Sequence, residues 1–178
     1  KLKPESLLVA AGRPEAPGAP LNAPIVPASN FLLGEGDVYA REDGTDTWRA
    51  FESALGALEG GQGLAFASGM AALTAVLLAV REKGKNHVVA VRPLYGGSDH
   101  LLEGGLLGHE VTFVTAEGIG AAIRLDTAAV ILETPGNPTL SLVDIEDAVR
   151  QGYLSLQQAV ERGERKKYAK RLMDRHGL

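Results

Sequence analysis

The segment Ser68-Gly69-Met70 has residue types suited to binding an anion, because it follows a short apolar stretch and opens a segment with helical spacing. A helix that begins there leaves its first backbone N–H groups without acceptors, and these groups together with the helix dipole favour a phosphate. Gly69 also has no Cβ to obstruct an approaching ligand. By spacing alone, an ordinary capped helix is the simpler interpretation. No Gly-Lys-Ser/Thr follows, so the segment is not a P-loop.

Two further candidate residues follow predicted strands. Tyr95, in Tyr95-Gly96-Gly97-Ser98, lies at the carboxyl end of a strand, where open parallel sheets bind ligands, and its flat ring could stack on a planar cofactor. Asn137 lies between prolines on a stiff loop, which suits a fixed hydrogen bond to a ligand. A tyrosine that covers a turn and a turn-forming asparagine are the structural alternatives. The adjacent Ser98, Asp99 and His100 do not by themselves indicate a hydrolase, because a triad needs convergence in space.

Alternating elements are expected to position these residues. We predict strands at residues 63–67, 87–91, 110–114 and 128–132, and helices at 47–60, 68–83, 98–107 and 119–124. Strands that alternate with helices indicate parallel βα units with helices on the faces of the sheet. After Pro138 the alternation stops. Asp144 is a candidate cap for a helix to about Gln151, and Ser155-Leu156-Gln157-Gln158 matches a capping box for a second helix.

The chain is predicted to have three parts. Residues 1–46 form an extended, proline-rich arm, because proline fixes φ and cannot donate to a strand ladder. Such an arm cannot bury itself, so we expect it to lie on another surface such as a second subunit. Residues 47–150 form an α/β domain. Residues 151–178 form a basic helical tail.

Composition excludes several classes of protein. The chain has 178 residues and no cysteine, so disulfides, thiolate metal sites and cysteine nucleophiles are absent, and the histidines show no ligand spacing. We therefore predict no metal site. Residues 1–149 carry a net charge of −9 and residues 150–178 a net charge of +5, which restricts any nucleic-acid contact to the tail, where a solvated helix face is the usual alternative. No apolar run is long enough to cross a bilayer, so we expect a cytoplasmic protein without a membrane partner.

Taken together, the motifs resemble the pyridoxal-phosphate-dependent enzymes of cysteine and methionine metabolism, such as cystathionine γ-lyase and γ-synthase. The likeness runs from about Leu7 to Asp144. The matching segments include Pro24-Ile25-Val26-Pro27, Tyr39-Ala40-Arg41, Leu58-Glu59-Gly60-Gly61, Ala67-Ser68-Gly69-Met70-Ala71-Ala72, Tyr95-Gly96-Gly97 and Glu133-Thr134-Pro135-Gly136-Asn137-Pro138. Their order and spacing together are highly specific. The resemblance implies an α/β fold, namely the first part of a fold type I large domain with a mainly parallel sheet, preceded by the extended arm.

The resemblance also implies roles for individual residues, with pyridoxal 5′-phosphate as the cofactor. Gly69 and Met70 would donate backbone N–H groups to its phosphate. Tyr39 and Arg41, on the arm, would reach the same phosphate in a neighbouring subunit. Tyr95 would stack on the pyridine ring and, as the predicted catalytic residue, lie near the leaving group of the substrate.

On the other side of the ring, the resemblance implies that Asn137 approaches the ring hydroxyl, with Glu133 supporting the loop. The sequence then departs from the family. In the family, an Asp pairs with the ring nitrogen and a Ser/Thr-rich segment carries the Schiff-base lysine, but residues 151–178 match neither.

Three functions stay open at this point. The first is a trans-sulfuration-type enzyme of sulfur amino acids, either a lyase or a transferase. It is truncated before the lysine segment, so that only part of the pocket is present and the active form would need residues supplied elsewhere. The second is a non-catalytic cofactor- or anion-binding module, and the third is a gene remnant. A parallel sheet interrupted midway would expose the strand at 128–132, so we expect a homo-oligomer or a completing chain.

Overall fold

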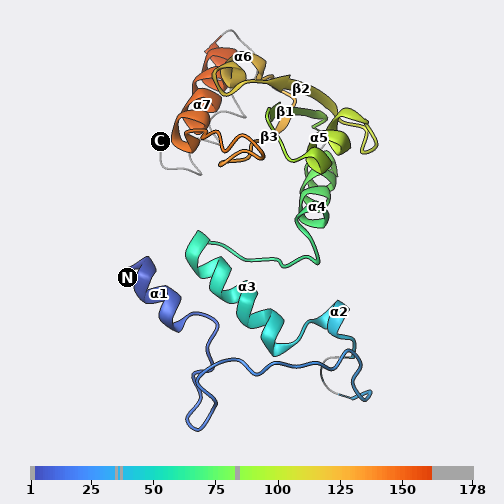
Figure 1. Ribbon diagram of the computed structural model, residues 1–178, viewed down its shortest axis with the longest axis vertical. Coiled ribbons are helices and arrows are strands. Elements are labelled where there is room, and N and C mark those ends of the chain that lie inside the picture. Colours follow the sequence, from blue (N-terminus) through green and yellow to red (C-terminus); the bar gives the residue numbers. More distant parts are fainter. Residues whose placement is uncertain (1–2, 35, 37, 83–84, 162–178) are drawn as a thin grey trace. The chain divides into compact units, whose positions relative to one another are not determined.

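The computed structural model describes residues 3–34, 36, 38–82 and 85–161, and the chain divides into two compact units, residues 1–67 and 68–178 (Figure 1). The first unit contains α1 (Pro4–Ala10), α2 (Ala40–Asp43) and α3 (Asp46–Glu59). Helix α3 confirms the helix predicted at 47–60. It begins after Thr45, whose Oγ1 accepts the Trp48 N–H at 3.3 Å, and it ends at Gly60 in a left-handed conformation with φ 67°.

The proline-rich arm is not extended throughout, because α1 and α2 lie within it. The expectation of a continuous extended segment is wrong at α1 since Pro4 occupies its first turn, where proline is compatible with a helix. The arm is also tied to α3 of its own chain. The Thr47 hydroxyl donates to the Pro24 carbonyl and accepts the Val26 N–H at 3.1 Å.

Residues 63–67 were predicted to form a strand, and the structure contradicts this. The segment has the apolar composition of a strand but pairs with no other strand among the described residues. Its Ala65 N–H instead donates to Glu52 Oε1 at 2.7 Å, and the same oxygen accepts the Trp48 indole N–H at 2.9 Å. A side chain of α3 thus provides the acceptor that a neighbouring strand would have provided.

The second unit contains a parallel sheet with the order β2-β1-β3. Its strands are β1 (His87–Val91), β2 (Glu110–Val114) and β3 (Thr127–Ile131). Its helices are α4 (Gly69–Glu82), α5 (Gly96–Glu103), the 3₁₀ turn η1 (Ala116–Gly118), α6 (Ile119–Ala122) and α7 (Ile145–Glu161). All five residues of the central β1 are buried, as expected for a strand covered on both faces. The predicted α/β architecture with a parallel sheet is confirmed.

Successive side chains of β1 feed two hydrophobic clusters, because they point to opposite faces of the sheet. Val88 and Ala90 pack with Leu77 of α4 and Leu102 of α5. Val91 packs with a second cluster, whose other buried members are Ile119 and Ala148. Helices α4 and α5 therefore cover one face of the sheet, and α6 and α7 cover the other (Figure 1).

His87 joins all three strands of the sheet. Its fully buried ring is hydrogen-bonded through Nδ1 to Thr127 Oγ1 of β3 at 2.7 Å, and through Nε2 to Thr112 Oγ1 of β2 at 2.9 Å. Burial lowers the pKa of His87, because it disfavours the charged imidazolium, and the nearby Arg124 guanidinium lowers it further. A neutral histidine in this position serves the cohesion of the sheet.

Helix α7 is continuous from Ile145 to Glu161, so the two separate helices predicted for this region are wrong. Ser155 was expected to cap the second helix. Its hydroxyl instead donates to the Gly120 carbonyl of α6 at 2.7 Å, and Gln151 Oε1 accepts the Gly120 N–H at 3.1 Å. Most of the predicted basic tail, residues 162–178, lies outside the described residues. In the described part of the chain, no helix is long and apolar enough to cross a membrane.

Candidate functional site

A cavity of about 480 Å³ lies in the second unit, where β1 and β3 end. It is lined by Ser68, Gly69, Met70, Leu73, Tyr95, Ser98, Ile131, Leu132 and Glu133. The first turns of α4 and α5 both border it, and the residues at the end of β3 complete its lining. This is the edge of a parallel sheet at which ligands bind, and it brings together three of the predicted site residues, Gly69, Met70 and Tyr95.

The first turn of α4 presents backbone donors to the cavity. Ser68 caps the helix, since its Oγ accepts the Ala71 N–H at 3.1 Å and its carbonyl accepts the Ala72 N–H at 3.1 Å. No hydrogen bond within the described part of the chain uses the N–H of Gly69 or Met70. A Cβ built on Gly69 would meet nothing within 4 Å, so the backbone there is open to a ligand. Two adjacent N–H groups at a helix N-terminus suit an anion.

The first turn of α5 already has an acceptor. Glu133 Oε2 accepts the Tyr95 N–H at 2.6 Å, and Glu133 Oε1 accepts the hydroxyl of the buried Ser98 at 3.1 Å. A carboxylate therefore occupies the positive end of this helix. Of the two helix N-termini at the cavity, α4 is the one at which no carboxylate accepts a hydrogen bond among the described residues.

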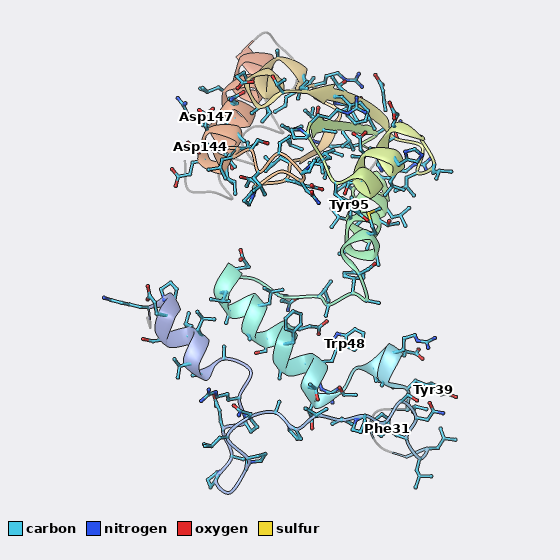
Figure 2. All side chains as sticks on the ribbon, in the orientation of Figure 1. Phe31, Tyr39, Trp48, Tyr95, Asp144 and Asp147 are labelled. Carbon is cyan, nitrogen blue, oxygen red and sulfur yellow. The ribbon has the colours of Figure 1, made fainter. Side chains whose placement is uncertain are left out.

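Tyr95 lies at the start of α5 (Figure 2), and its ring is half exposed. The ring rests on the backbone of Gly97, where an added Cβ would lie 2.6 Å from Tyr95 Cε1 and 3.2 Å from Met70 Sδ. Gly97 is thus required by the close approach of the tyrosine ring. The ring and the α4 donors border the same cavity.

The other predicted cofactor residues are not among those that line this cavity. Asn137 is exposed, on a loop in which the Gly136 N–H donates to the Ser141 carbonyl at 2.8 Å. Tyr39 and Arg41 belong to the first unit, so their roles stay predictions. There, Asp43 Oδ2 accepts the Tyr39 N–H at 3.0 Å, a hydrogen bond that lowers the pKa of Asp43.

Sequence reasoning missed the pairing of Ser98 with Glu133. Ser98 stands beside Asp99 and His100 in the sequence, but the Asp99 carboxylate pairs with Arg92 at 2.7 Å, so these residues form no triad. The signal that could have found the pair is positional. Both residues follow strands of one parallel sheet, and the carboxyl ends of such strands lie at the same edge.

Comparisons with known proteins connect this chain to a family. The family model described as Cys/Met metabolism PLP-dependent enzyme matches residues 19–153. An L-methionine gamma-lyase from Brevibacterium sandarakinum is 44% identical over 170 residues, which cover 83% of this chain and 43% of that protein. A cystathionine gamma-synthase from Mycobacterium bovis is 36% identical over 145 residues, covering 75% of this chain and 37% of that protein.

The fold agrees with these relatives. The crystal structure of cystathionine gamma-lyase from Lactobacillus plantarum complexed with L-serine matches with a TM-score of 0.68 and 29% identity, over 86% of this chain and 42% of that one. The chain therefore spans less than half the length of these relatives. The resemblance read from the sequence is confirmed, and the chain belongs to the family of PLP-dependent enzymes of Cys/Met metabolism.

Proposed function

We propose that the cavity between the first turns of α4 and α5 binds pyridoxal 5′-phosphate, with its phosphate on the N–H groups of Gly69 and Met70. The observation that carries this proposal is the pair of unused donors at the start of α4 in a chain of a PLP-dependent family. Their position, beside a half-exposed tyrosine ring, suits a ligand that is anionic at one end and flat at the other.

The remaining site residues have the roles that the family resemblance implies. Tyr95 stacks on the pyridine ring and lies close to the leaving group of the substrate. Asn137 approaches the ring hydroxyl, and Tyr39 and Arg41 reach the phosphate of a neighbouring subunit. The bound cofactor supplies an electron sink, while the residues of this chain orient it and hold its charges.

The whole protein is proposed to be a trans-sulfuration-type enzyme that eliminates or replaces a group on a sulfur amino acid. The relatives named above are a gamma-lyase and a gamma-synthase, which supports this class of reaction. A cytoplasmic location is part of the proposal, as expected for an enzyme that uses free amino acids. Among the described residues lining the cavity there is no lysine, which favours cofactor binding without turnover as the second candidate function for the chain by itself.

Binding of an aldehyde-free analogue tests the proposed site. Pyridoxine 5′-phosphate has no aldehyde and cannot react with surface lysines. A titration monitored by equilibrium dialysis therefore measures the affinity of the pocket alone. We expect this analogue to bind at least about tenfold more tightly than pyridoxine, because charge-assisted hydrogen bonds to the phosphate contribute roughly 1.5–3 kcal/mol each. Inorganic phosphate is expected to compete. Equal affinity for the two compounds would contradict a phosphate site at α4.

We also propose that the chain associates with a second copy or with a completing chain. Strand β3 forms one edge of the described sheet, it contains no charged residue, and Val130 in it is partly exposed. Apolar edge strands without protective charges favour pairing with another chain. Light scattering over a range of concentrations is expected to give a mass above that of the monomer. Val130→Lys is expected to lower that mass, and a monomer at every concentration would contradict the proposal.

A further inference from the structure

The carboxylate of Glu133 is fully engaged at the first turn of α5. Its two oxygens accept hydrogen bonds from the Tyr95 N–H at 2.6 Å and from the Ser98 hydroxyl at 3.1 Å. Glu133 is separated from these residues by more than thirty positions and comes from the end of β3. We infer that Glu133 is a positioning residue that fixes the Tyr95 ring beside the phosphate donors of α4, an inference that rests on the proposed function of this cavity.

The Tyr95 ring depends on its backbone for its position. The residue is 51% exposed, so packing covers only about half of it. Its contact is with the backbone of Gly97, close enough that an added Cβ would collide with the ring. The Glu133 hydrogen bond fixes the Tyr95 amide, and the bond to buried Ser98 fixes the first turn of the helix three residues further on. Both anchors bracket the segment that carries the ring.

Glu133 also determines the orientation of a ligand in the cavity. Two helix N-termini border the cavity, and each attracts negative charge. The Glu133 carboxylate places a negative charge at the end of α5 and repels a second anion there. The phosphate is thereby directed to the N–H groups of Gly69 and Met70, where no carboxylate accepts a hydrogen bond among the described residues. The flat part of the ligand is then directed toward Tyr95. One carboxylate thus both holds the ring and orients the ligand.

A double-mutant cycle on the full chain tests the inference, with pyridoxine 5′-phosphate as the probe. Glu133→Ala is expected to weaken binding about threefold to tenfold, the loss typical of one hydrogen bond. In a Tyr95→Ala background the same change is expected to have no further effect, because the ring it positions is gone. Affinity for inorganic phosphate should not fall. Glu133→Gln is the matched control, since its amide oxygen can accept the Tyr95 N–H and its amide nitrogen can donate to Ser98.

A cofactor-free measurement separates this inference from the proposed function. In the unliganded protein, the Tyr95 ring is expected to shift the NMR signals of the Gly97 α-protons. Glu133→Ala should remove this shift as Tyr95→Ala does, whereas Glu133→Gln should keep it. If the analogue fails to bind, the proposed function fails and the Gly97 signal still decides the role of Glu133. A persistent shift in Glu133→Ala, or purely additive losses in the cycle, would overturn the inference. Should Glu133→Ala not fold, Ser98→Ala replaces it, with a smaller loss of the shift expected.

Discussion

Replacing Gly69 with proline is expected to lower the affinity for pyridoxine 5′-phosphate by at least about tenfold, because it removes one charge-assisted hydrogen bond. Gly69 is the first residue of α4, a position at which proline is favoured since its missing N–H has no acceptor within the helix. Ser68, which caps α4, then precedes a proline, and cap residues already have the extended conformation that proline requires. The substitution therefore removes a ligand donor while keeping the helix. Equilibrium dialysis measures the affinity, and far-UV circular dichroism checks the fold.

The neighbouring helix provides a matched control for this substitution. Gly96 is the first residue of α5 and also has open space around its Cβ position, and Tyr95 before it is extended, with ψ 135°. Gly96→Pro thus makes the same chemical change at the helix end that Glu133 already occupies. We expect it to leave phosphate affinity unchanged. If Gly69→Pro bound the analogue as tightly as the unmodified chain, or if both prolines weakened binding equally, the α4 donors would not be the phosphate site.

The sequence predicted those elements whose signal is contained in a short window. The strands predicted at 87–91 and 110–114 are β1 and β2 with the predicted bounds, and β3 begins and ends one residue before the predicted 128–132. The errors arise where a residue distant in the sequence determines the local structure. The apolar run at 63–67 gives its Ala65 N–H to Glu52 instead of to a strand. Ser155 has the spacing of a cap but bonds to α6, so α7 continues through it.

The same distinction holds for the site. Spacing alone favoured an ordinary capped helix at Ser68, and Ser68 does cap α4, but the cap leaves the N–H groups of Gly69 and Met70 unused. The structural and functional interpretations of this motif are therefore compatible. By contrast, the contact between Glu133 and the turn at Tyr95 depends on the order of strands in the sheet. A local pattern cannot contain that information, although the shared edge of a parallel sheet restricts the possibilities.

Truncation of Leu77 is expected to be the most destabilising single change among those considered for the second unit. Leu77 is fully buried and belongs to the cluster formed with Val88, Ala90, Leu94 and Leu102. Leu77→Ala removes apolar contacts and leaves a cavity, which costs about 2–5 kcal/mol in comparable cores. Because small domains have a total stability of only about 5–15 kcal/mol, this is a large fraction. Thermal and urea unfolding, followed by circular dichroism, measure the change in the free energy of unfolding.

Leu78→Ala is the matched control for Leu77→Ala, because the two leucines differ in burial. Leu78 lies on the same helix and is 46% exposed, so Leu78→Ala has the same effect on helix propensity but creates no buried cavity. We expect it to cost less than about 1 kcal/mol. Because α4 also carries Gly69 at its first position, loss of the Leu77 anchor should weaken analogue binding at temperatures where the variant starts to unfold, whereas Leu78→Ala should not. Equal destabilisation by the two changes would show that α4 does not pack on β1 as described, and the geometry of the cavity would then have to be revised.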